Sequence, residues 1–233
     1  MFKDKSVIVT GGAGALGREV VNWFSSRGAQ VAVLDISAEV LDQAFPEPAS
    51  NHCYIACDLA ARSSCADAVA QVQARFGKVD ILCNIAGGFM MGEPVHKTTD
   101  ATWDFLFDLN ARSVMNMSAA VVPLLLAADG GKIVNVAAHA ALGGGALMGP
   151  YTASKAAVLR LTESMALELR EQKINVNCVL PSLIDTPRNR QDMPDADYSK
   201  WVTPAQIASV IGFLASADAS AVHGAGVPVD GLS

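Results

Sequence analysis

A cluster of glycines between a predicted strand and a predicted helix constrains the fold of this chain more than any other feature. Residues 5–10 have the continuous apolar pattern of a buried strand, and the glycine-rich residues 11–17 follow at once. Small residues let the backbone approach a pyrophosphate, and the start of a helix supplies free N–H groups and the positive end of a dipole. A helical pattern then continues through Val20, Val21 and Phe24. This order predicts a dinucleotide cradle.

The remaining chain repeats the alternation of strand and helix. Several of the strand-like runs are continuously apolar, as expected of strands that helices cover on both faces. Such alternation produces right-handed crossovers and a parallel sheet. With 51 % hydrophobic residues and no dividing linker, residues 1–233 are predicted to form one α/β domain. We expect a doubly wound parallel sheet (Rossmann fold) with about seven strands, at 5–10, 30–35, 53–57, 79–83, 132–137, 174–180 and 225–229.

An acidic residue ends the second predicted strand. Asp35 lies 18 residues after Gly17 and is followed by Ile36, and residues 11–17 contain no basic side chain. At this position a carboxylate accepts hydrogen bonds from the adenosine ribose hydroxyls and repels a 2′-phosphate. The pattern favours NAD over NADP as the cofactor. The alternative is that Asp35 is an ordinary turn residue at the end of a strand.

A tyrosine and a lysine lie four residues apart at the start of another predicted helix. The segment Tyr151-Thr-Ala-Ser-Lys155 continues into the apolar run 156–161, so the two side chains share one helix face. At a separation of roughly 5 Å, an ammonium lowers the pKa of a phenol by about two units, whereas burial raises it. Tyr151 is therefore a candidate acid/base. Taken alone, the pair also arises by chance on amphipathic helices.

Together these motifs resemble the short-chain dehydrogenase/reductase family over essentially the whole chain. The resemblance implies an oxidoreductase that moves hydride between NAD(H) and a small organic substrate. It assigns the proton transfer to Tyr151, and to Lys155 the lowering of the Tyr151 pKa and the binding of the nicotinamide ribose. Asn110, which lies 41 residues before Tyr151, corresponds to the asparagine that anchors a water in the family's proton relay.

The resemblance also assigns a set of cofactor contacts along the ends of the predicted strands. The glycine-rich turn would hold the pyrophosphate, residues after the third strand would contact adenine, and those after the sixth would hold the nicotinamide amide. Tyr151 and Lys155 belong to the cofactor site as well. The other assigned residues are Gly11, Gly14, Ala15, Leu16, Gly17, Asp35, Asp58, Leu59, Asn84, Ala86, Gly87, Pro181 and Thr186.

The chain departs from the family pattern at the position of the catalytic serine. That serine normally lies 13 residues before the tyrosine, where this chain has Ala138, and the family's Pro-Gly pair reads Pro181-Ser182. A hydrogen bond directed at the transition state is worth about 3 kcal/mol, or roughly a hundredfold in rate. Either the substrate does not need the hydroxyl, or another group replaces it, or catalysis has been lost. His139 is adjacent, but neighbouring strand residues point to opposite faces, which disfavours it as the replacement.

Two alternatives therefore accompany the main functional prediction. Residues 149–151 and 180–190 resemble the dihydropteridine reductase branch, which also lacks the serine and keeps the tyrosine and lysine. This favours an NADH-dependent reductase of a quinonoid dihydropteridine, a quinone or an imine. The alternative from another class is a non-catalytic NAD-binding or sensing protein. The apolar Phe89, Met90, Met91 and Met148 either line a flat substrate pocket or fill the core.

Charge, cysteines and the chain start exclude several other classes. A net charge of −6 without a basic cluster disfavours nucleic acid as a partner. The first strand begins within a few residues and no run reaches 18 apolar residues, so we expect no signal peptide, no membrane association and a cytoplasmic location. Five scattered cysteines match no zinc spacing, and neither a metal site nor a disulfide framework is expected.

Two further segments suggest roles at the surface. The irregular stretch 183–203 is predicted to be a substrate lid or a plain surface loop. The apolar helix predicted at 103–126, interrupted by Pro123, resembles with the Tyr151 helix the family's four-helix dimer surface. The resemblance implies a homo-oligomer, either a dimer or a tetramer. The alternative is simple burial of that helix against the sheet.

Overall fold

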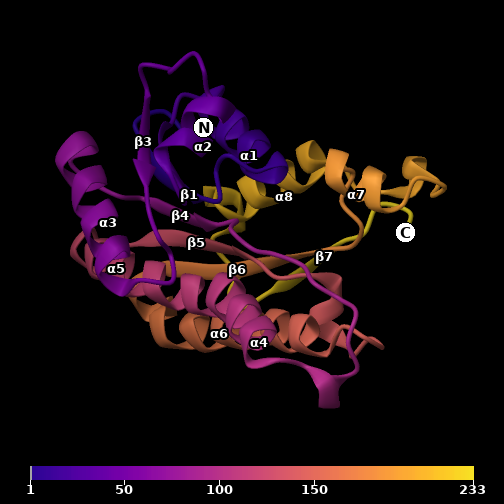
Figure 1. Cartoon of the computed structure of the whole chain (residues 1–233). Helices are drawn as coiled ribbons and strands as arrows, with labels where there is room; N and C mark the ends of the chain where they lie inside the picture. Colours follow the sequence, from indigo (N-terminus) through magenta and orange to yellow (C-terminus); the bar gives the residue numbers. More distant parts are fainter. Residues whose placement is uncertain (1) are drawn as a thin grey trace.

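The computed structural model describes residues 2–233 and contains one seven-stranded parallel sheet (Figure 1). The strand order is β3-β2-β1-β4-β5-β6-β7, so the direction of winding reverses between β1 and β4. The predicted doubly wound α/β fold is confirmed. Its strands are β1 (Ser6–Thr10), β2 (Gln30–Asp35), β3 (His52–Ala56), β4 (Ile81–Asn84), β5 (Gly131–Val136), β6 (Ile174–Pro181) and β7 (Gly226–Val229).

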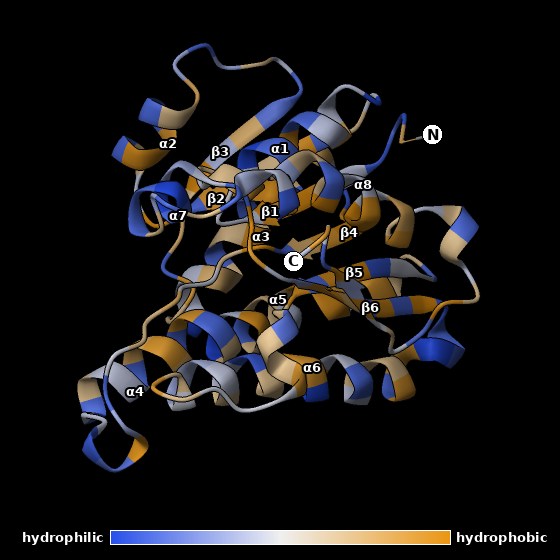
Figure 2. Cartoon of the chain, turned by 90° about the vertical axis from the view of Figure 1, so that its right-hand side faces the viewer, coloured by the Kyte–Doolittle hydropathy of each residue, from blue (hydrophilic) through white to orange (hydrophobic). Residues whose placement is uncertain are grey.

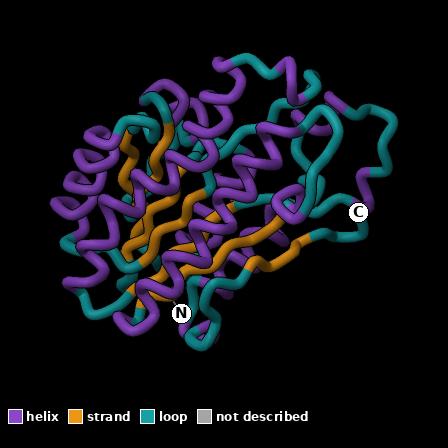
Figure 3. Tube along the Cα trace, turned by 90° about the horizontal axis from the view of Figure 1, so that it is seen from below, coloured by secondary structure: helices purple, strands orange, loops and turns teal. Residues whose placement is uncertain are grey.

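Helices cover both faces of the sheet. In Figure 1, α1, α2 and α8 lie above the sheet, and α3, α5 and α6 lie below it. Seen from below in Figure 3, the lower helices cross over the strands. The helices are α1 (Ala15–Ser25), α2 (Ala38–Ala44), α3 (Arg62–Phe76), α4 (Asp100–Phe107), α5 (Ser113–Ala127), α6 (Gly149–Leu169), α7 (Pro187–Asp192) and α8 (Pro204–Leu214).

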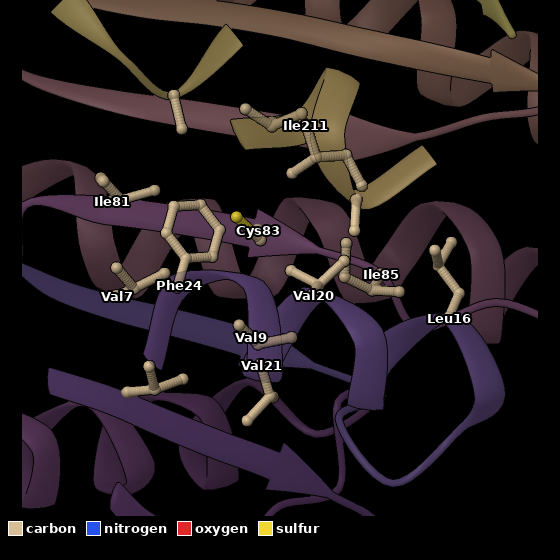
Figure 4. Packing of buried hydrophobic residues seen from close by; sticks show 14 of the residues in the cluster. Val7, Val9, Leu16, Val20, Val21, Phe24, Ile81, Cys83, Ile85 and Ile211 are labelled. Carbon is tan, nitrogen blue, oxygen red and sulfur yellow. The ribbon is translucent and has the colours of Figure 1, made fainter. Parts of the chain in front are cut away.

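The core is divided by the sheet into two layers. Alternate residues of a strand point to opposite faces, so Val7 and Val9 pack in the α1/α8 layer, whereas Ile8 packs in the α3/α5 layer. Figure 2 shows hydrophobic residues concentrated on the strands and on the helix faces turned toward them. In the upper layer, Phe24 of α1 and Ile211 of α8 lie close to the β1 and β4 side chains (Figure 4). Burial of both strand faces explains the continuous apolar runs of the sequence.

The strand limits agree with the sequence prediction to within two residues, and those of β2 agree fully. The largest shift is at β4, which begins at Ile81 rather than at residue 79. Just before it, the Asp80 carboxylate accepts hydrogen bonds from the Ser6 backbone N–H at 2.9 Å and the Lys5 ammonium at 2.9 Å. These bonds tie the loop to the start of β1, and regular strand pairing begins after them.

The predicted helix at 103–126 is wound differently in its middle. Five residues, Asp108–Arg112, form a π-helical turn between α4 and α5, and Pro123 lies inside α5 without ending it. π-turns recur at functional sites, and this one contains Asn110. The continuous run Asp100–Ala127 is long and apolar enough to cross a membrane by length and composition. Half of its most apolar window is buried in the protein, and core helices of globular folds pass the same test.

The stretch 183–203 contains more regular structure than the sequence predicted. Thr186 caps the short helix α7 by accepting from the Asn189 N–H at 3.2 Å, and Ile184 pairs with Val202 at the base of the stretch. Within it, the Arg190 guanidinium donates to both oxygens of Asp185 at 2.6 and 2.8 Å. Contacts within the stretch itself therefore hold it in a folded surface segment.

Candidate active site

The assigned residues come together along one edge of the sheet. They follow the carboxyl ends of strands β1 to β6, and carboxyl ends of parallel strands share an edge. Open α/β sheets bind ligands there, at the point where the winding reverses. In this chain that point lies between β1 and β4. The candidate residues predicted from the sequence therefore lie at the sheet edge where this topology binds ligands.

The glycine-rich turn has the geometry of a backbone cradle. Gly11 has φ +62°, and a Cβ on it would lie 2.7 Å from the Ala86 Cα. A Cβ on Gly17 would lie 2.0 Å from the Gly11 carbonyl oxygen, so neither position accommodates a side chain. Helix α1 begins at Ala15 with no side-chain cap. The first N–H groups of α1, those of Ala15, Leu16 and Gly17, therefore remain available to an anion.

The carboxylate of Asp35 lies against this turn. Its Oδ2 accepts from the Ala13 N–H at 3.0 Å, and its Oδ1 accepts from the Ile36 N–H at 2.8 Å. Charge-assisted bonds of this kind fix the carboxylate beside the cradle. A negative charge is thus fixed where the sequence places the adenosine ribose.

The loop that would contact adenine is fixed by a residue that the sequence patterns did not predict. Asp58 turns the loop by accepting from the Ala60 N–H at 2.9 Å. Asn116 of α5 donates to the carbonyl oxygens of Leu59 and Ala60 at 2.9 and 3.0 Å. Asn116 is buried in a mostly apolar helix, and this polar residue among apolar neighbours is a sequence signal of its role.

The turn after β4 is held by the end of β1. The Thr10 hydroxyl oxygen accepts from the N–H groups of Ile85 at 3.1 Å and Ala86 at 3.2 Å. Thr10 was predicted only as a strand residue. Because these bonds fix Ala86 directly beside Gly11, they set the spacing between the turns that follow β1 and β4.

Asn84 is buried inside the sheet. Its Nδ2 donates to the Asn135 Oδ1 at 2.8 Å, and the Asn135 Nδ2 donates in turn to the Thr162 hydroxyl at 2.9 Å. The Asn84 Oδ1 is buried and has no partner within residues 2–233. The side chain that the resemblance assigned to the cofactor therefore links β4 to β5.

Two polar side chains, those of Lys155 and Asn110, meet at Gly87 in the turn after β4. The Lys155 ammonium is buried and donates to the Val136 carbonyl oxygen at 3.0 Å. A Cβ on Gly87 would lie 2.8 Å from the Lys155 Nζ and 3.0 Å from the Asn110 Oδ1. A side chain on Gly87 would therefore force the Lys155 ammonium to move.

Asn110 connects this centre to α6. Its Oδ1 accepts from the Gly88 N–H at 2.9 Å, while its Nδ2 donates to the Gly88 carbonyl at 3.1 Å and to the Ser154 hydroxyl at 2.9 Å. The Ser154 hydroxyl donates to the Tyr151 carbonyl oxygen at 2.8 Å. Asn110 thereby joins the turn after β4 to the helix turn that carries Tyr151. Ser154 lies within the Tyr–Lys segment, yet spacing alone did not indicate this role.

Burial decides the ionisation of the Tyr–Lys pair. It raises the pKa of Tyr151 to about 12 and lowers the pKa of Lys155 to about 8. The expected lowering of the Tyr151 pKa by a nearby ammonium is therefore wrong for this structure. Lys155 donates to Val136, and the Tyr151 ring instead packs edge-on against Phe89, with centroids 4.8 Å apart. Tyr151 is thus a protonated phenol at neutral pH.

No group of three or more His, Cys, Asp or Glu side chains within residues 2–233 is arranged to hold a metal ion.

Comparison with known proteins identifies this arrangement. The family model described as short chain dehydrogenase matches residues 5–197. The chain belongs to the short-chain dehydrogenase/reductase family. It is 35 % identical to 2-(R)-hydroxypropyl-CoM dehydrogenase of Xanthobacter autotrophicus, over 98 % of each chain. It is 30 % identical to an NAD-dependent glycerol dehydrogenase of Listeria innocua, over 98 % of this chain and 93 % of that protein. NAD⁺-bound xylitol dehydrogenase has a TM-score of 0.90 and 25 % identity, with 99 % of each chain covered.

This short-chain dehydrogenase/reductase is an oxidoreductase that lacks the family's serine hydroxyl. Ala138, at the serine position, is buried just beyond the end of β5. His139 does not continue the strand, because β5 ends at Val136 and a 3₁₀ turn runs over His139–Leu142. Because His139 lies outside the strand, the alternation of strand side chains does not determine which way its ring points.

Proposed function

We propose that this protein is an NAD(H)-dependent oxidoreductase acting on a small organic substrate, with Tyr151 as the acid/base and no catalytic serine. The observation that carries the proposal is the juxtaposition of the buried Lys155 with Asn110 and Gly87, one helical turn from Tyr151. This centre lies at the same sheet edge as the cradle beside Asp35. Relatives described as NAD-dependent or NAD⁺-bound support the nicotinamide cofactor.

The residues present fit a dinucleotide. Gly11 and Gly17 leave a cradle that a Cβ would fill, and the uncapped start of α1 faces it with free N–H groups. Bound NAD(H) supplies or accepts the hydride. Tyr151 would donate its proton to the substrate during reduction, and its raised pKa keeps that proton in place at neutral pH. Lys155 would hold the nicotinamide ribose, and Asn110 would position a water that returns the proton. Pro181 and Thr186 would border the nicotinamide.

Asp35 is expected to make NADH bind at least tenfold tighter than NADPH, a difference of ~1.4 kcal/mol. The reason is that a 2′-phosphate would be placed against a carboxylate already fixed by the Ala13 and Ile36 N–H groups. Asp35→Ala should reduce the difference between the NADH and NADPH dissociation constants. Calorimetric titration with both cofactors measures it, with Asp42→Ala, an exposed carboxylate on α2, as the matched control. Equal dissociation constants in the wild type would contradict the assignment.

Lys155→Met is expected to stabilise the cofactor-free protein at pH 6.5 by roughly 1–3 kcal/mol, because an ammonium is no longer buried. The folded Lys155 pKa is about 8, against 10.5 as the ordinary value. Between those values the unfolded chain binds a proton that the folded chain has released, so wild-type stability rises with pH relative to the variant. The advantage of the variant is therefore full below pH ~8 and declines toward pH ~10.5.

Urea denaturation of both proteins at pH 6.5 and 9.5 measures this difference. Lys97→Met, at an exposed position, serves as the control and should show no such pH dependence. A stability advantage that grows with rising pH would show that the Lys155 pKa is not depressed by burial.

The missing serine favours a second candidate, an NADH-dependent reductase of a quinonoid dihydropteridine, a quinone or an imine. A conjugated acceptor spreads its charge over several atoms, so one acid suffices. Phe89, which packs against the Tyr151 ring, is 54 % exposed, and the two residues that follow it, Met90 and Met91, are 42 % and 58 % exposed. Such a rim suits a flat ring. NADH oxidation across ketones, quinones and quinonoid dihydropterin separates the candidates. Turnover of any of them would exclude a non-catalytic NAD sensor.

The stretch 183–203 would act as the substrate lid, since it follows β6 at the cofactor edge.

We further propose a cytoplasmic homodimer or homotetramer built on the α4–α5 and α6 surfaces. The exposed Met115 and Leu126 on α5 and Leu167 on α6 support that surface. Light scattering in solution tests the assembly.

A further inference from the structure

His139 is paired with a residue from the far end of the chain. Its Nδ1 lies 2.8 Å from the Asp230 Oδ1, across 91 residues of sequence. A carboxylate only accepts hydrogen bonds, so the bonded Nδ1 carries a proton. In the neutral imidazole, the remaining nitrogen is then an acceptor. Within residues 2–233 the Nε2 has no hydrogen-bond partner, and 53 % of the side chain is exposed.

Asp230 is also bonded to one of the positions at which the chain departs from its family. Ser182, which stands in place of the family's glycine, donates from its hydroxyl to the Asp230 carbonyl oxygen at 2.8 Å. Its oxygen also lies 2.7 Å from the Ser233 hydroxyl. Ser182 thus fixes the backbone of Asp230, which in turn fixes the ring that follows Ala138. The hydroxyl of Ser182 is therefore part of the network that orients His139, the residue after Ala138.

His139 also lines a hollow next to the first turn of α6. This hollow has a volume of about 380 Å³, and Leu142, Met148 and Thr152 contribute to its walls. Met148 and Thr152 flank the turn that contains Tyr151. His139 is therefore a polar residue in a largely apolar hollow at the helix turn that carries the proposed acid/base.

We propose that His139, oriented by Asp230, is a substrate-positioning residue whose Nε2 accepts a hydrogen bond from an O–H or N–H group beside the reacting carbon. An acceptor cannot stabilise a developing alkoxide, so His139 does not replace the missing serine. It instead selects substrates in which a donor flanks the carbonyl or imine. The inference rests on the proposed hydride-transfer function and narrows its substrate class.

A matched pair of probes tests the inference. 3-Hydroxybutan-2-one carries an O–H donor beside its carbonyl, whereas butane-2,3-dione has no donor there. His139→Phe should lower kcat/KM for the hydroxyketone about tenfold, mainly through KM, and change the value for the dione less than twofold. His139→Gln retains an acceptor and should restore part of the loss. His96→Phe, at an exposed histidine outside the network, should leave both probes unchanged.

Asp230→Asn supplies an independent arm. An amide can donate to the Nδ1, which would leave the proton on the Nε2 and convert the acceptor into a donor. In this variant kcat/KM for the hydroxyketone should fall, whereas kcat/KM for the dione should stay unchanged. Ligand-observed NMR with both probes and the NAD⁺-loaded protein measures the same difference in affinity without turnover.

Three results would overturn the proposal: equal changes for the two probes in His139→Phe, no change for either, or loss accompanied by a changed molecular mass in light scattering. The last would mark His139 as a subunit-contact residue. NADH binding is measured on the same preparations. Absence of NADH binding contradicts the proposed function, whereas normal NADH binding without a donor-dependent difference contradicts only the role of His139.

Discussion

Tyr151→Phe is expected to lower kcat by roughly a hundredfold or more while leaving the NADH dissociation constant nearly unchanged. The phenol lies one helical turn from the buried Lys155, on the same helix. Burial raises its pKa to about 12, so it is fully protonated at neutral pH and can act as a donor. Its removal deletes a proton transfer without touching the cradle around Gly11 and Asp35.

Stopped-flow turnover and NADH titration on the same preparation separate these two quantities. Tyr54→Phe, in β3, is the matched control and should retain wild-type turnover. Lys155→Ala should weaken both turnover and NADH binding, because Lys155 would also hold the ribose. Near-normal turnover by Tyr151→Phe would mean that the proton comes from elsewhere, with Ser182 or a water as the first groups to examine.

Ala138→Ser is expected to have opposite consequences for two substrate classes. It should raise weak activity on isolated ketones by up to roughly a hundredfold, the usual worth of one hydrogen bond aimed at a developing oxyanion. If the native acceptor is conjugated, as the second candidate holds, its rate of reduction should stay flat or fall, because the developing charge is delocalised and the buried position has little spare room. Ala138 is only 7 % exposed.

Parallel kcat/KM measurements on simple ketones, quinones and quinonoid dihydropterin test this asymmetry. Ala141→Ser adds a hydroxyl three residues further along and should not discriminate between the classes. Wild-type protein that already turns over simple ketones within the ordinary enzyme range of ~10⁴–10⁸ M⁻¹s⁻¹ would contradict the argument from the missing hydroxyl. The site would then contain a different oxyanion donor.

Ala138 by itself also suits a protein that binds NAD without catalysis. The structure keeps the rest of the machinery assembled: Asn110 bonds to Gly88 and Ser154, and Lys155 is buried beside them. A buried ammonium opposes folding unless a ligand or a reaction makes use of its charge. The free-energy cost of burying Lys155 is easier to reconcile with a catalytic site than with a protein that has lost catalysis.

The sequence alone was sufficient to predict the seven-stranded fold, the glycine-rich turn and the pairing of Tyr151 with Lys155 on one helix face. These features depend on local patterns: continuous apolar runs mark strands covered on both faces, and a spacing of four residues fixes a shared helix face. The consequence of burial was not local. The two pKa shifts oppose the simple charge argument because segments remote in sequence exclude water from both groups.

Long-range contacts were likewise decided only by the tertiary structure. Thr10 reaches Ile85 across 75 residues, Asn116 reaches Leu59 across 57, and His139 reaches Asp230 across 91. No periodicity records which side chains of distant segments will meet, since the parallel sheet brings together the ends of strands that are far apart in the chain. The sequence thus determined which chemical groups are present at this edge, and the packing of the sheet determined their partners and their ionisation.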